Sequence, residues 1–334
     1  MSGSRRIRWG VLGVAGIAVK KVIPAMQHCS RAEITAIASR DSARAERAAA
    51  DLDIPKAYGS YEDLLADSDI DAIYNPLPNH LHVPWSIRAA EAGKHVLCEK
   101  PIGLSSDECR HLIAVRDRTN RKIAEAFMVR THPQWLRTRE LIRSGRIGEL
   151  RSIIGFFSYY NVDPANVRNQ PDIGGGALMD IGCYPITMSR WIFGEEPVSV
   201  QGVIERDPVM KTDRLTSGIL EFPSGQSIFT CSTQLVPYQR MQFLGTKGRI
   251  EVEIPFNAPP DRACRIFIDS GVDILGSGIE TETFVACNQY TIQGDLFSRA
   301  IQEDTPVAVP LEDALNNMIV IERLVASAEA LRVR

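Results

Sequence analysis

The chain has 334 residues, of which 44% are hydrophobic and 24% are charged, proportions that are ordinary for a globular protein. This length is long for one domain and suits two. The formal net charge of −3 is too small to favour nucleic acid or an anionic membrane surface as the main partner, so we expect neither.

The cysteines and the N-terminal residues indicate the cellular compartment of the protein. The seven cysteines are scattered without a Cys-x-x-Cys pair, which is typical of free thiols rather than a disulfide or zinc framework. No stretch of about 18 apolar residues would span a membrane, and the first residues pass into a strand pattern without an apolar signal core. We therefore expect a cytoplasmic protein. His80 and His82 are not spaced for one helix face and have no cluster of acids or cysteines nearby, so we expect no metal site.

The first part of the chain alternates strands and helices. Apolar runs predict strands, and polar-apolar periodicity predicts helices of 10–15 residues between them, as is typical of βαβ units with a parallel sheet. The expected strands are 7–14, 33–39, 72–75, 94–98 and 122–126, and the expected helices are 16–28, 42–52, 82–92 and 105–118. The fold class is therefore α/β, with a doubly wound Rossmann domain over residues 1–127.

After about residue 127 the regular alternation of strands and helices ends. Strand-like runs separated by Pro, Gly and Asp predict an open, mainly antiparallel sheet, hence an α+β domain over residues 128–334. The runs are 150–161, 197–206, 215–222, 226–234, 239–244, 248–254, 264–269 and 279–285, with helices at 133–144, 177–193, 290–303 and 311–331.

The small residues after the first strand stand where a dinucleotide-binding turn requires them. From Gly13 the pattern is Gly-x-Ala-x-x-Ala, ending at Ala18, where a small residue lets strand and helix pack closely. Ala15 stands where Gly usually lets a pyrophosphate approach the backbone, and Gly16 in a shifted turn is the alternative. A tight turn without ligand is also open. The βαβ order favours a cofactor held by Gly13, Ala15, Gly16, Ile17 and Ala18, with its pyrophosphate at the helix N-terminus.

The second strand ends in Ser39 and Arg40, where an NAD-binding domain normally has an acid. A hydroxyl and a guanidinium suit the 2′-phosphate of NADP, because Arg binds phosphate through two parallel N–H groups. We therefore expect NADP. Asp41 follows directly and leaves NAD possible, and a ligand-free reading makes Arg40 an exposed loop charge.

Three further segments carry a family resemblance. They are residues 74–82 (Tyr-Asn-Pro-Leu-Pro-Asn-His-Leu-His), 99–101 (Glu-Lys-Pro) and 174–184, which runs from Gly-Gly-Gly to Asp180 and Tyr184. In this order and at these spacings they resemble the Gfo/Idh/MocA oxidoreductase family. Within it the chain is most similar to the glucose–fructose oxidoreductase, NADP-dependent D-xylose dehydrogenase and trans-dihydrodiol dehydrogenase branch. Many members have His at the position of Tyr184, whereas that branch has Tyr.

The resemblance implies roles for individual residues. In this family the lysine of Glu-Lys-Pro works at the nicotinamide, which corresponds to Lys100, and the preceding Glu99 serves structure or a ribose hydroxyl. The segment before it lines the ribose and nicotinamide end of the cofactor, and carries over to Asn75, Leu77, Pro78, Asn79 and His82. Family members often use the second-domain sheet for oligomer contacts, so the resemblance implies a homodimer or homotetramer.

Asp180 and Tyr184 are four residues apart on a predicted helix, so they share one face. A phenol has a reference pKa near ~10, and a nearby ammonium such as Lys100 favours its ionised form. Tyr184 would then take the hydroxyl proton while hydride leaves for nicotinamide. Asp180 would position the substrate hydroxyl or Lys100, and the glycines before it would let a substrate or cofactor ring approach the backbone.

Each of these residues also has a structural alternative. Tyr184 could hold its helix to the sheet, Asp180 could complement the helix dipole, and Lys100 could be solvated. Arg168 and Tyr290 are further candidates for contact with a sugar-like substrate, although an exposed loop arginine is equally compatible with position 168.

The expected function is an NADP-dependent oxidoreductase that oxidises a sugar-like hydroxyl, with Tyr184 as proton acceptor or donor assisted by Lys100. The alternatives are reduction of a keto-sugar or anhydro-sugar, oxidation of a dihydrodiol, and a non-enzymatic sensor of NADP or sugar. Because Lys100, Asp180 and Tyr184 are all present, the sensor is the least favoured.

Overall fold

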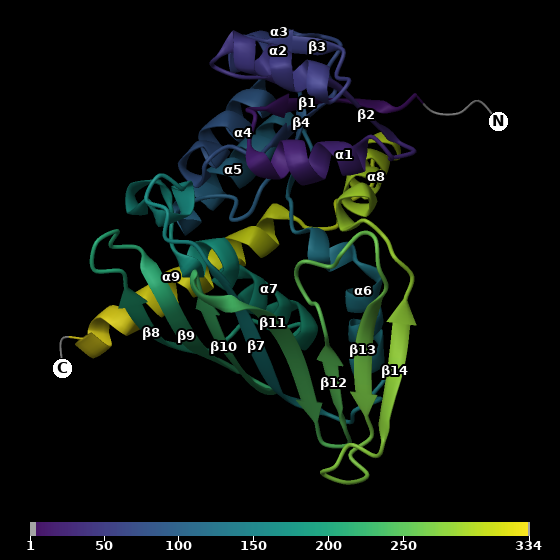
Figure 1. The fold of residues 1–334 in the computed structure, drawn as a ribbon, viewed down its shortest axis with the longest axis vertical. Helices are drawn as coiled ribbons and strands as arrows, with labels where there is room; N and C mark the ends of the chain where they lie inside the picture. Colours follow the sequence, from purple (N-terminus) through teal and green to yellow (C-terminus); the bar gives the residue numbers. More distant parts are fainter. Residues whose placement is uncertain (1–4, 333–334) are drawn as a thin grey trace. The chain divides into compact units, whose positions relative to one another are not determined.

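The structure, a computed structural model, describes residues 5–332 of the chain. These residues form two compact units, one built up to Met128 together with Asn288–Leu315, and the other from Val129–Cys287 and from Asn316 onward (Figure 1). Residues 288–315, which the sequence analysis placed in a second domain at 128–334, pack with the first unit. None of the described helices is long and apolar enough to cross a membrane.

The first unit is built on the predicted parallel sheet. Within the described residues the sheet has six strands in the order β3-β2-β1-β4-β5-β6, all paired in parallel. This is the strand order of a doubly wound dinucleotide-binding domain, and it confirms the predicted fold class. The strands are β1 (Ile7–Leu12), β2 (Ala32–Ala38), β3 (Lys56–Tyr58), β4 (Ala72–Asn75), β5 (His95–Cys98) and β6 (Ile123–Glu125).

Several helices of this unit begin at residues whose side chains cap them. The side chains of Asp41, Ser60 and Ser105 each accept a hydrogen bond from the backbone amide three residues later. The helical elements are the π-helical turn η1 (Ala18–Val22), α1 (Ile23–Met26), α2 (Ser42–Asp51), α3 (Tyr61–Ala66), the 3-10 turn η2 (Asn79–Leu81), α4 (His82–Glu91), α5 (Ser106–Thr119) and α8 (Gln289–Gln302).

Helix α8 explains why residues 288–315 belong to the first unit. The indole N–H of Trp9 on β1 donates to Ser298 Oγ at 3.1 Å, and the ring of Phe297 lies 5.4 Å from that of Trp9. All three side chains are buried. The contact therefore buries large aromatic surface while the indole N–H keeps a partner, which fixes α8 against the central strand of the sheet.

The second unit is built on the predicted open sheet. In the part of the chain that is described, its eight strands run β14-β13-β12-β11-β7-β10-β9-β8, and all pairs are antiparallel except β7 with β10. The strands are β7 (Leu150–Tyr160), β8 (Ser199–Arg206), β9 (Asp213–Phe222), β10 (Gly225–Ser232), β11 (Gln234–Gly245), β12 (Arg249–Val252), β13 (Cys264–Asp269) and β14 (Ile279–Phe284).

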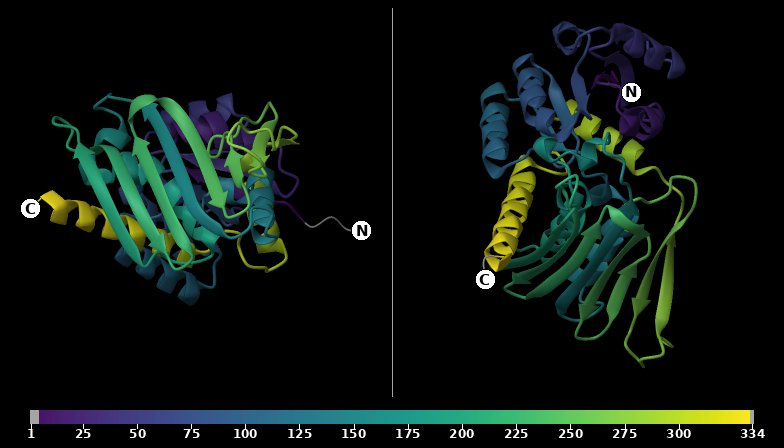
Figure 2. Two further views of the ribbon diagram at one scale, coloured as in Figure 1. Left: turned by 90° about the horizontal axis from the view of Figure 1, so that it is seen from below. Right: turned by 60° about the vertical axis from the view of Figure 1, so that its left-hand side comes forward.

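Helices pack on one face of this sheet, and no described helix covers the other (Figure 2). On the covered face Ser189 of α7 shares a hydrogen bond with Ser227 of β10, and Leu324 of α9 lies against Gly202 and Gly218. The helical elements are η3 (Met128–Thr131), α6 (Pro133–Arg143), the 3-10 turns η4 (Val167–Asn169) and η5 (Pro171–Ile173), the π-helical turn η6 (Leu178–Gly182), α7 (Cys183–Phe193) and α9 (Leu311–Arg332). Most of α9 thus belongs to the second unit.

Candidate active site

The turn after β1 holds Gly13 in a left-handed backbone conformation and leaves Gly16 open to space. Gly13 has φ +80°, and a Cβ there would lie 2.9 Å from Leu77 Cδ2, so glycine is required on both counts. A Cβ at Gly16 would meet nothing within 4 Å, which leaves open space beside the helix N-terminus. Ala18 is fully buried where helix and strand pack together. These residues fit a dinucleotide pyrophosphate, for which open space and unpaired amides at a helix start are needed.

The end of β2 carries the groups that would meet the ribose of the cofactor. Asp41 Oδ1 accepts the Arg44 amide at 3.1 Å, so this carboxylate caps α2. Ser39 is buried, and its hydroxyl accepts the Asp41 amide at 3.2 Å. Arg40 is exposed. A guanidinium beside a carboxylate that is already used as a cap favours a phosphate over a ribose hydroxyl at this position.

Tyr61 and Arg44, which the sequence analysis did not single out, also lie at the end of β2. Burial raises the pKa of the Tyr61 hydroxyl, and the adjacent Arg40 guanidinium, which hydrogen-bonds to it, opposes that rise. Arg44 Nη2 donates to the carbonyl oxygen of Val14 at 2.9 Å, which ties the first turn of α2 to the turn after β1. The signal in the sequence was the place of Arg44 three residues after a capping acid, where its side chain lies near the helix start.

The loop after β4 is held together by its own polar side chains. Asn75 Nδ2 donates to the carbonyl of His82 at 3.0 Å and to Ser86 Oγ at 3.2 Å, while Asn75 Oδ1 accepts the Leu77 amide at 3.3 Å. The two ring nitrogens of His82 lie 2.8 Å from the Pro101 carbonyl and 2.6 Å from that of Leu77. Asn75 and His82 are buried, so they shape this loop from within.

The same loop presents its remaining predicted residues around the turn η2. Pro78 precedes the turn, Asn79 begins it, and Leu77 lies against the space that a side chain at Gly13 would occupy. Through the His82 bridge the loop is tied to the segment that holds Lys100. Of the predicted cofactor residues of this motif, Asn75, Leu77 and His82 are therefore buried within the loop, and Pro78 and Asn79 are partly exposed on it.

Lys100 follows β5 and lies in a backbone that is fixed on both sides. Tyr74 Oη donates to Glu99 Oε1 at 2.7 Å, and Glu99 Oε2 accepts the Lys100 amide at 3.3 Å. Beyond it, the Ile102 amide donates to Glu125 Oε1 at 2.9 Å. The half-buried carboxylate of Glu99 and the buried one of Glu125 thus hold the strand exit in one shape, which suits a lysine that must keep its place.

Tyr290, in the first turn of α8, lies in the same electrostatic environment as Glu99 and Lys100. Burial raises the pKa of Tyr290, the Glu99 charge adds to the rise, and the Lys100 ammonium opposes it. The amide of Tyr290 donates to Asn288 Oδ1 at 3.0 Å, so the residue starts a capped helix. The first unit thus gathers Glu99, Lys100 and Tyr290 around the carboxyl end of β5.

The second unit holds the other three predicted residues together. Asp180 lies in the π-helical turn η6, and its Oδ2 accepts hydrogen bonds from Arg168 Nε at 2.9 Å and Tyr159 Oη at 2.6 Å. The pKa of Arg168 is raised chiefly by the Asp180 charge, with Tyr159 and Tyr184 adding to the effect. Arg168 is therefore an ion-pair partner of Asp180 and not an isolated loop charge.

Tyr184 stands in the first turn of α7, with its side chain largely buried. Its ring centroid lies 5.6 Å from Phe157 and 5.2 Å from Phe256, both of the same unit. The apolar rings fix the phenol ring by packing, and the effect of Tyr184 on the Arg168 pKa places the two side chains in one electrostatic environment.

The glycine-rich turn before Asp180 differs from the expectation. A Cβ at Gly175 would lie 2.6 Å from the Gln170 carbonyl, and one at Gly176 would lie 1.9 Å from Asp213 Oδ1. The protein itself therefore occupies the approach to these two glycines, which the sequence analysis had left to a substrate or cofactor ring. The glycines are required because the preceding loop and β9 pack directly on the turn.

Asp213 is a residue that the sequence reasoning missed. Its Oδ2 accepts the Leu178 amide at 2.7 Å and the Thr216 hydroxyl at 3.0 Å. Burial raises the pKa of Asp213 to about 6. It thereby anchors the start of the helix that carries Asp180, from a strand more than thirty residues later in the chain.

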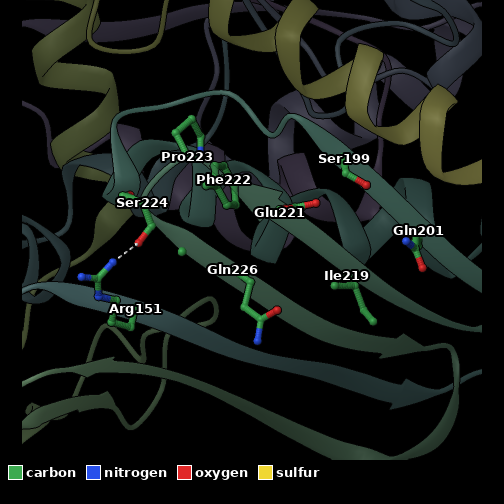
Figure 3. A pocket seen from close by; sticks show the side chains of 10 residues that line it. Arg151, Ser199, Gln201, Ile219, Glu221, Phe222, Pro223, Ser224 and Gln226 are labelled. Carbon is green, nitrogen blue, oxygen red and sulfur yellow. Dashed lines mark hydrogen bonds between the residues drawn. The ribbon is translucent and has the colours of Figure 1, made fainter.

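Two other features of the molecule lie outside this set. A hollow on the uncovered face of the second sheet is lined by Gln201, Ile219 and Gln226 around the β9–β10 turn, where Arg151 Nη1 donates to the Ser224 carbonyl at 3.3 Å (Figure 3). It contains no predicted site residue. Among residues 5–332, no three His, Cys, Asp or Glu side chains are grouped to hold a metal ion.

Known protein families match both units of the chain. A family model described as an oxidoreductase family with an NAD-binding Rossmann fold matches residues 7–127, and the GFO/IDH/MocA C-terminal domain model matches residues 135–251. The uncharacterized oxidoreductase ORF334 of Rhizobium meliloti is 48% identical over 97% of both chains. D-xylose 1-dehydrogenase (NADP(+)) 2 of Haloferax volcanii is 39% identical over 96% of this chain and 97% of its own.

A solved structure matches the whole fold. A 3-ketoreductase from Actinomadura kijaniata, in complex with NADP and TDP-benzene, superposes with a TM-score of 0.90 at 29% identity, over 97% of this chain and 98% of that chain. The likeness spans both units.

Proposed function

Because the chain belongs to the Gfo/Idh/MocA family and is an NAD(P)-dependent oxidoreductase, we propose that it transfers hydride between NADP and a hydroxyl of a sugar-like substrate, an aldose or related polyol. The observation that carries the proposal is the Tyr159–Asp180–Arg168 cluster, with Tyr184 in the same electrostatic environment. Such a cluster can hold a hydroxyl and exchange its proton. The relatives that act on sugars support the substrate class.

NADP is the cofactor that the end of β2 favours. Arg40 and Arg44 supply two guanidiniums, Ser39 supplies a hydroxyl, and the carboxylate of Asp41 is used as a helix cap. The pyrophosphate would lie at Gly13–Ala18, and the nicotinamide end near Leu77, Asn79 and Lys100. When bound, the nicotinamide accepts or donates the hydride. The Haloferax xylose dehydrogenase and the ketoreductase, both named with NADP, support this choice.

The proton is assigned to Tyr184. A phenol of reference pKa near ~10 becomes a useful base when a cation favours its ionised form, and Lys100 is assigned that role. Asp180 would orient the substrate hydroxyl or the lysine ammonium, and Arg168 would bind further substrate hydroxyls. Glu99 and His82 keep Lys100 in place through the backbone bonds described above.

Reduction of a keto-sugar is the second candidate, because the solved relative is a 3-ketoreductase. The same groups serve either direction, since Tyr184 would return the proton that it takes in oxidation. Dihydrodiol oxidation, and reduction of an anhydro-sugar, remain within the same chemistry. A substrate panel with aldoses and NADP⁺, and with keto-sugars and NADPH, followed by the absorbance of the reduced nicotinamide, separates them. No turnover with any sugar, polyol, keto-sugar or diol would contradict the proposal.

A homo-oligomer through the uncovered face of the second sheet completes the proposal. Ile154, Ile228 and Ile219 are direct partners on the neighbouring strands β7, β10 and β9, and all three are exposed. Val203 and Tyr238 add exposed apolar side chains on the flanking strands. A row of exposed apolar side chains across a broad sheet is typical of a surface that another chain covers, and a second copy offers the same row.

A further inference from the structure

Two side chains of the second unit converge on the same oxygen of Asp180. Tyr159 Oη donates to Oδ2 at 2.6 Å and Arg168 Nε donates to it at 2.9 Å. A hydroxyl that donates to a carboxylate at this distance makes one of the stronger hydrogen bonds in a protein. The position of the carboxylate is thus set by β7 and by the loop before the glycine turn, as well as by its own helix.

The two donors differ in how firmly they are held. The Arg168 side chain is 43% exposed and comes from the short turn η4, whereas Tyr159 comes from β7, a strand with neighbours on both sides. Because Arg168 is the more exposed donor, it is the one open to a substrate hydroxyl. Tyr159 lies near the end of β7 and supplies a second donor to the same carboxylate oxygen.

The spacing of β7 matches that of the helix above it. Phe157 and Tyr159 point to the same face because they are two residues apart, roughly 6.6 Å along a strand, and Asp180 and Tyr184 are separated by about one helical turn. Phe157 contacts the Tyr184 ring, and Tyr159 contacts Asp180. The strand thus presents an apolar ring to the phenol and a hydroxyl to the carboxylate.

We propose that Tyr159 is a positioning residue of the hydride-transfer reaction, which acts by holding the carboxylate of Asp180. The inference rests on the proposed function, in which Asp180 orients the substrate hydroxyl or Lys100. Tyr159 therefore does not take part in proton transfer itself. Its removal should lower the rate of hydride transfer through Asp180 alone.

The test is a double-mutant cycle with Tyr159→Phe, Asp180→Asn and the double variant, measured as single-turnover hydride transfer at high enzyme concentration. We expect Tyr159→Phe to lower the rate by about 10-fold or more, which is the typical loss for a hydrogen bond to a charged group. In the Asp180→Asn background the same change should alter the rate by less than about threefold, because the amide oxygen of Asn accepts a neutral hydrogen bond in place of the stronger one to a carboxylate. Tyr160→Phe, on the adjacent exposed position, is the matched control and should leave the rate unchanged.

The outcomes separate the inference from the function on which it rests. Additive losses in the double variant would mean that the Tyr159 hydroxyl acts independently of Asp180, and would overturn the inference. A silent Tyr159→Phe beside an impaired Asp180→Asn would also overturn it, and would leave the proposed function standing. A silent Asp180→Asn would contradict the proposed role of the acid itself. If Tyr159→Phe melts well below the parent protein, all four proteins are measured at a temperature at which each is folded by circular dichroism, and the same additivity criterion applies.

Discussion

The carboxylate of Asp213 occupies the space that a side chain at position 176 would need. An ideal Cβ on Gly176 would lie 1.9 Å from Asp213 Oδ1, and the same carboxylate accepts the Leu178 amide at 2.7 Å. The start of the helix that carries Asp180 and Tyr184 is thus fixed by a contact between a glycine and an acid on a distant strand. Two predictions follow from this pair, two from the rest of the site and one from the exposed face of the second sheet.

Gly176→Ala should destabilise the protein strongly. The residue has φ +121°, which an L side chain rarely adopts, and the added methyl group would collide with Asp213. Backbone strain of this kind costs about 1–3 kcal/mol before the collision is added. Denaturant unfolding measures the loss. Gly93→Ala is the control, since Gly93 has φ +81° with nothing within 4 Å, and should show only the strain. Equal losses for the two variants would contradict the role of Asp213.

Asp213→Asn should change how stability depends on pH. The pKa of Asp213 is raised to about 6 by burial, so the folded state holds its proton more tightly than the unfolded chain. That stabilisation is complete below the unfolded pKa near 3.8 and is lost as the pH rises through about 6. The free energy of unfolding of the wild type relative to Asp213→Asn should therefore fall by about 3 kcal/mol between those values. A difference that stays constant with pH would show that the carboxyl group does not titrate in this way.

Tyr184→Phe and Lys100→Ala should each lower kcat by about 100-fold or more, the usual size of a general acid–base contribution. Binding of NADP⁺, followed by protein fluorescence, should be little changed for Tyr184→Phe because the phenol is assigned to the substrate proton. Lys247→Ala, an exposed lysine of the second unit, serves as the control. Full turnover in purified Tyr184→Phe would remove Tyr184 as the proton carrier.

Arg40→Ala should raise the KM for NADP⁺ by about 10- to 100-fold, because a hydrogen-bonded charge pair with the 2′-phosphate is lost. The KM for NAD⁺, which has no such phosphate, should stay the same. Arg44→Ala should act in the same direction, and Arg47→Ala, exposed on the same helix, should not. An unchanged ratio of the two KM values in Arg40→Ala would place the phosphate elsewhere.

Ile219→Asp should shift the protein to a smaller oligomer, because it puts a charge into the exposed isoleucine row on the second sheet. Sedimentation velocity measures the change. Val209→Asp is the control, since Val209 is also an exposed apolar residue but lies between β8 and β9 and outside that row. Identical sedimentation of Ile219→Asp and the parent protein would exclude this face as the interface.

Much of the fold could be predicted because it follows from local periodicity. The strand and helix alternation of the first unit, and the closely spaced strands of the second, were predicted and are confirmed. Strand β3 and helix α3 were missed, since elements of three and six residues carry too little pattern. The return of α8 to β1 was also missed, because the Trp9–Ser298 bond joins residues that no local pattern relates.

The candidate site likewise contains residues that a local sequence pattern marks and residues that only the fold brings together. Residues within motifs, such as Gly13, Lys100 and Asp180, could be proposed because the sequence patterns and the family resemblance single them out. Asp213 and Tyr159 were not, since each acts on its partner only after two strands have been brought under a helix. The purpose of the glycine-rich turn was misread for the same reason: a glycine shows that something lies close, but not whether that is a ligand or the protein itself.

Two of the helices that begin at the site start with a π-helical turn, Ala18–Val22 after the glycine turn and Leu178–Gly182 around Asp180. Such a turn holds one residue more than an α-helical turn. One residue can therefore be removed from either turn while the α-helix that follows keeps its packing on the sheet. For protein engineering, deletion of Met179 is a way to change the direction of the Asp180 side chain without altering the strands that support it.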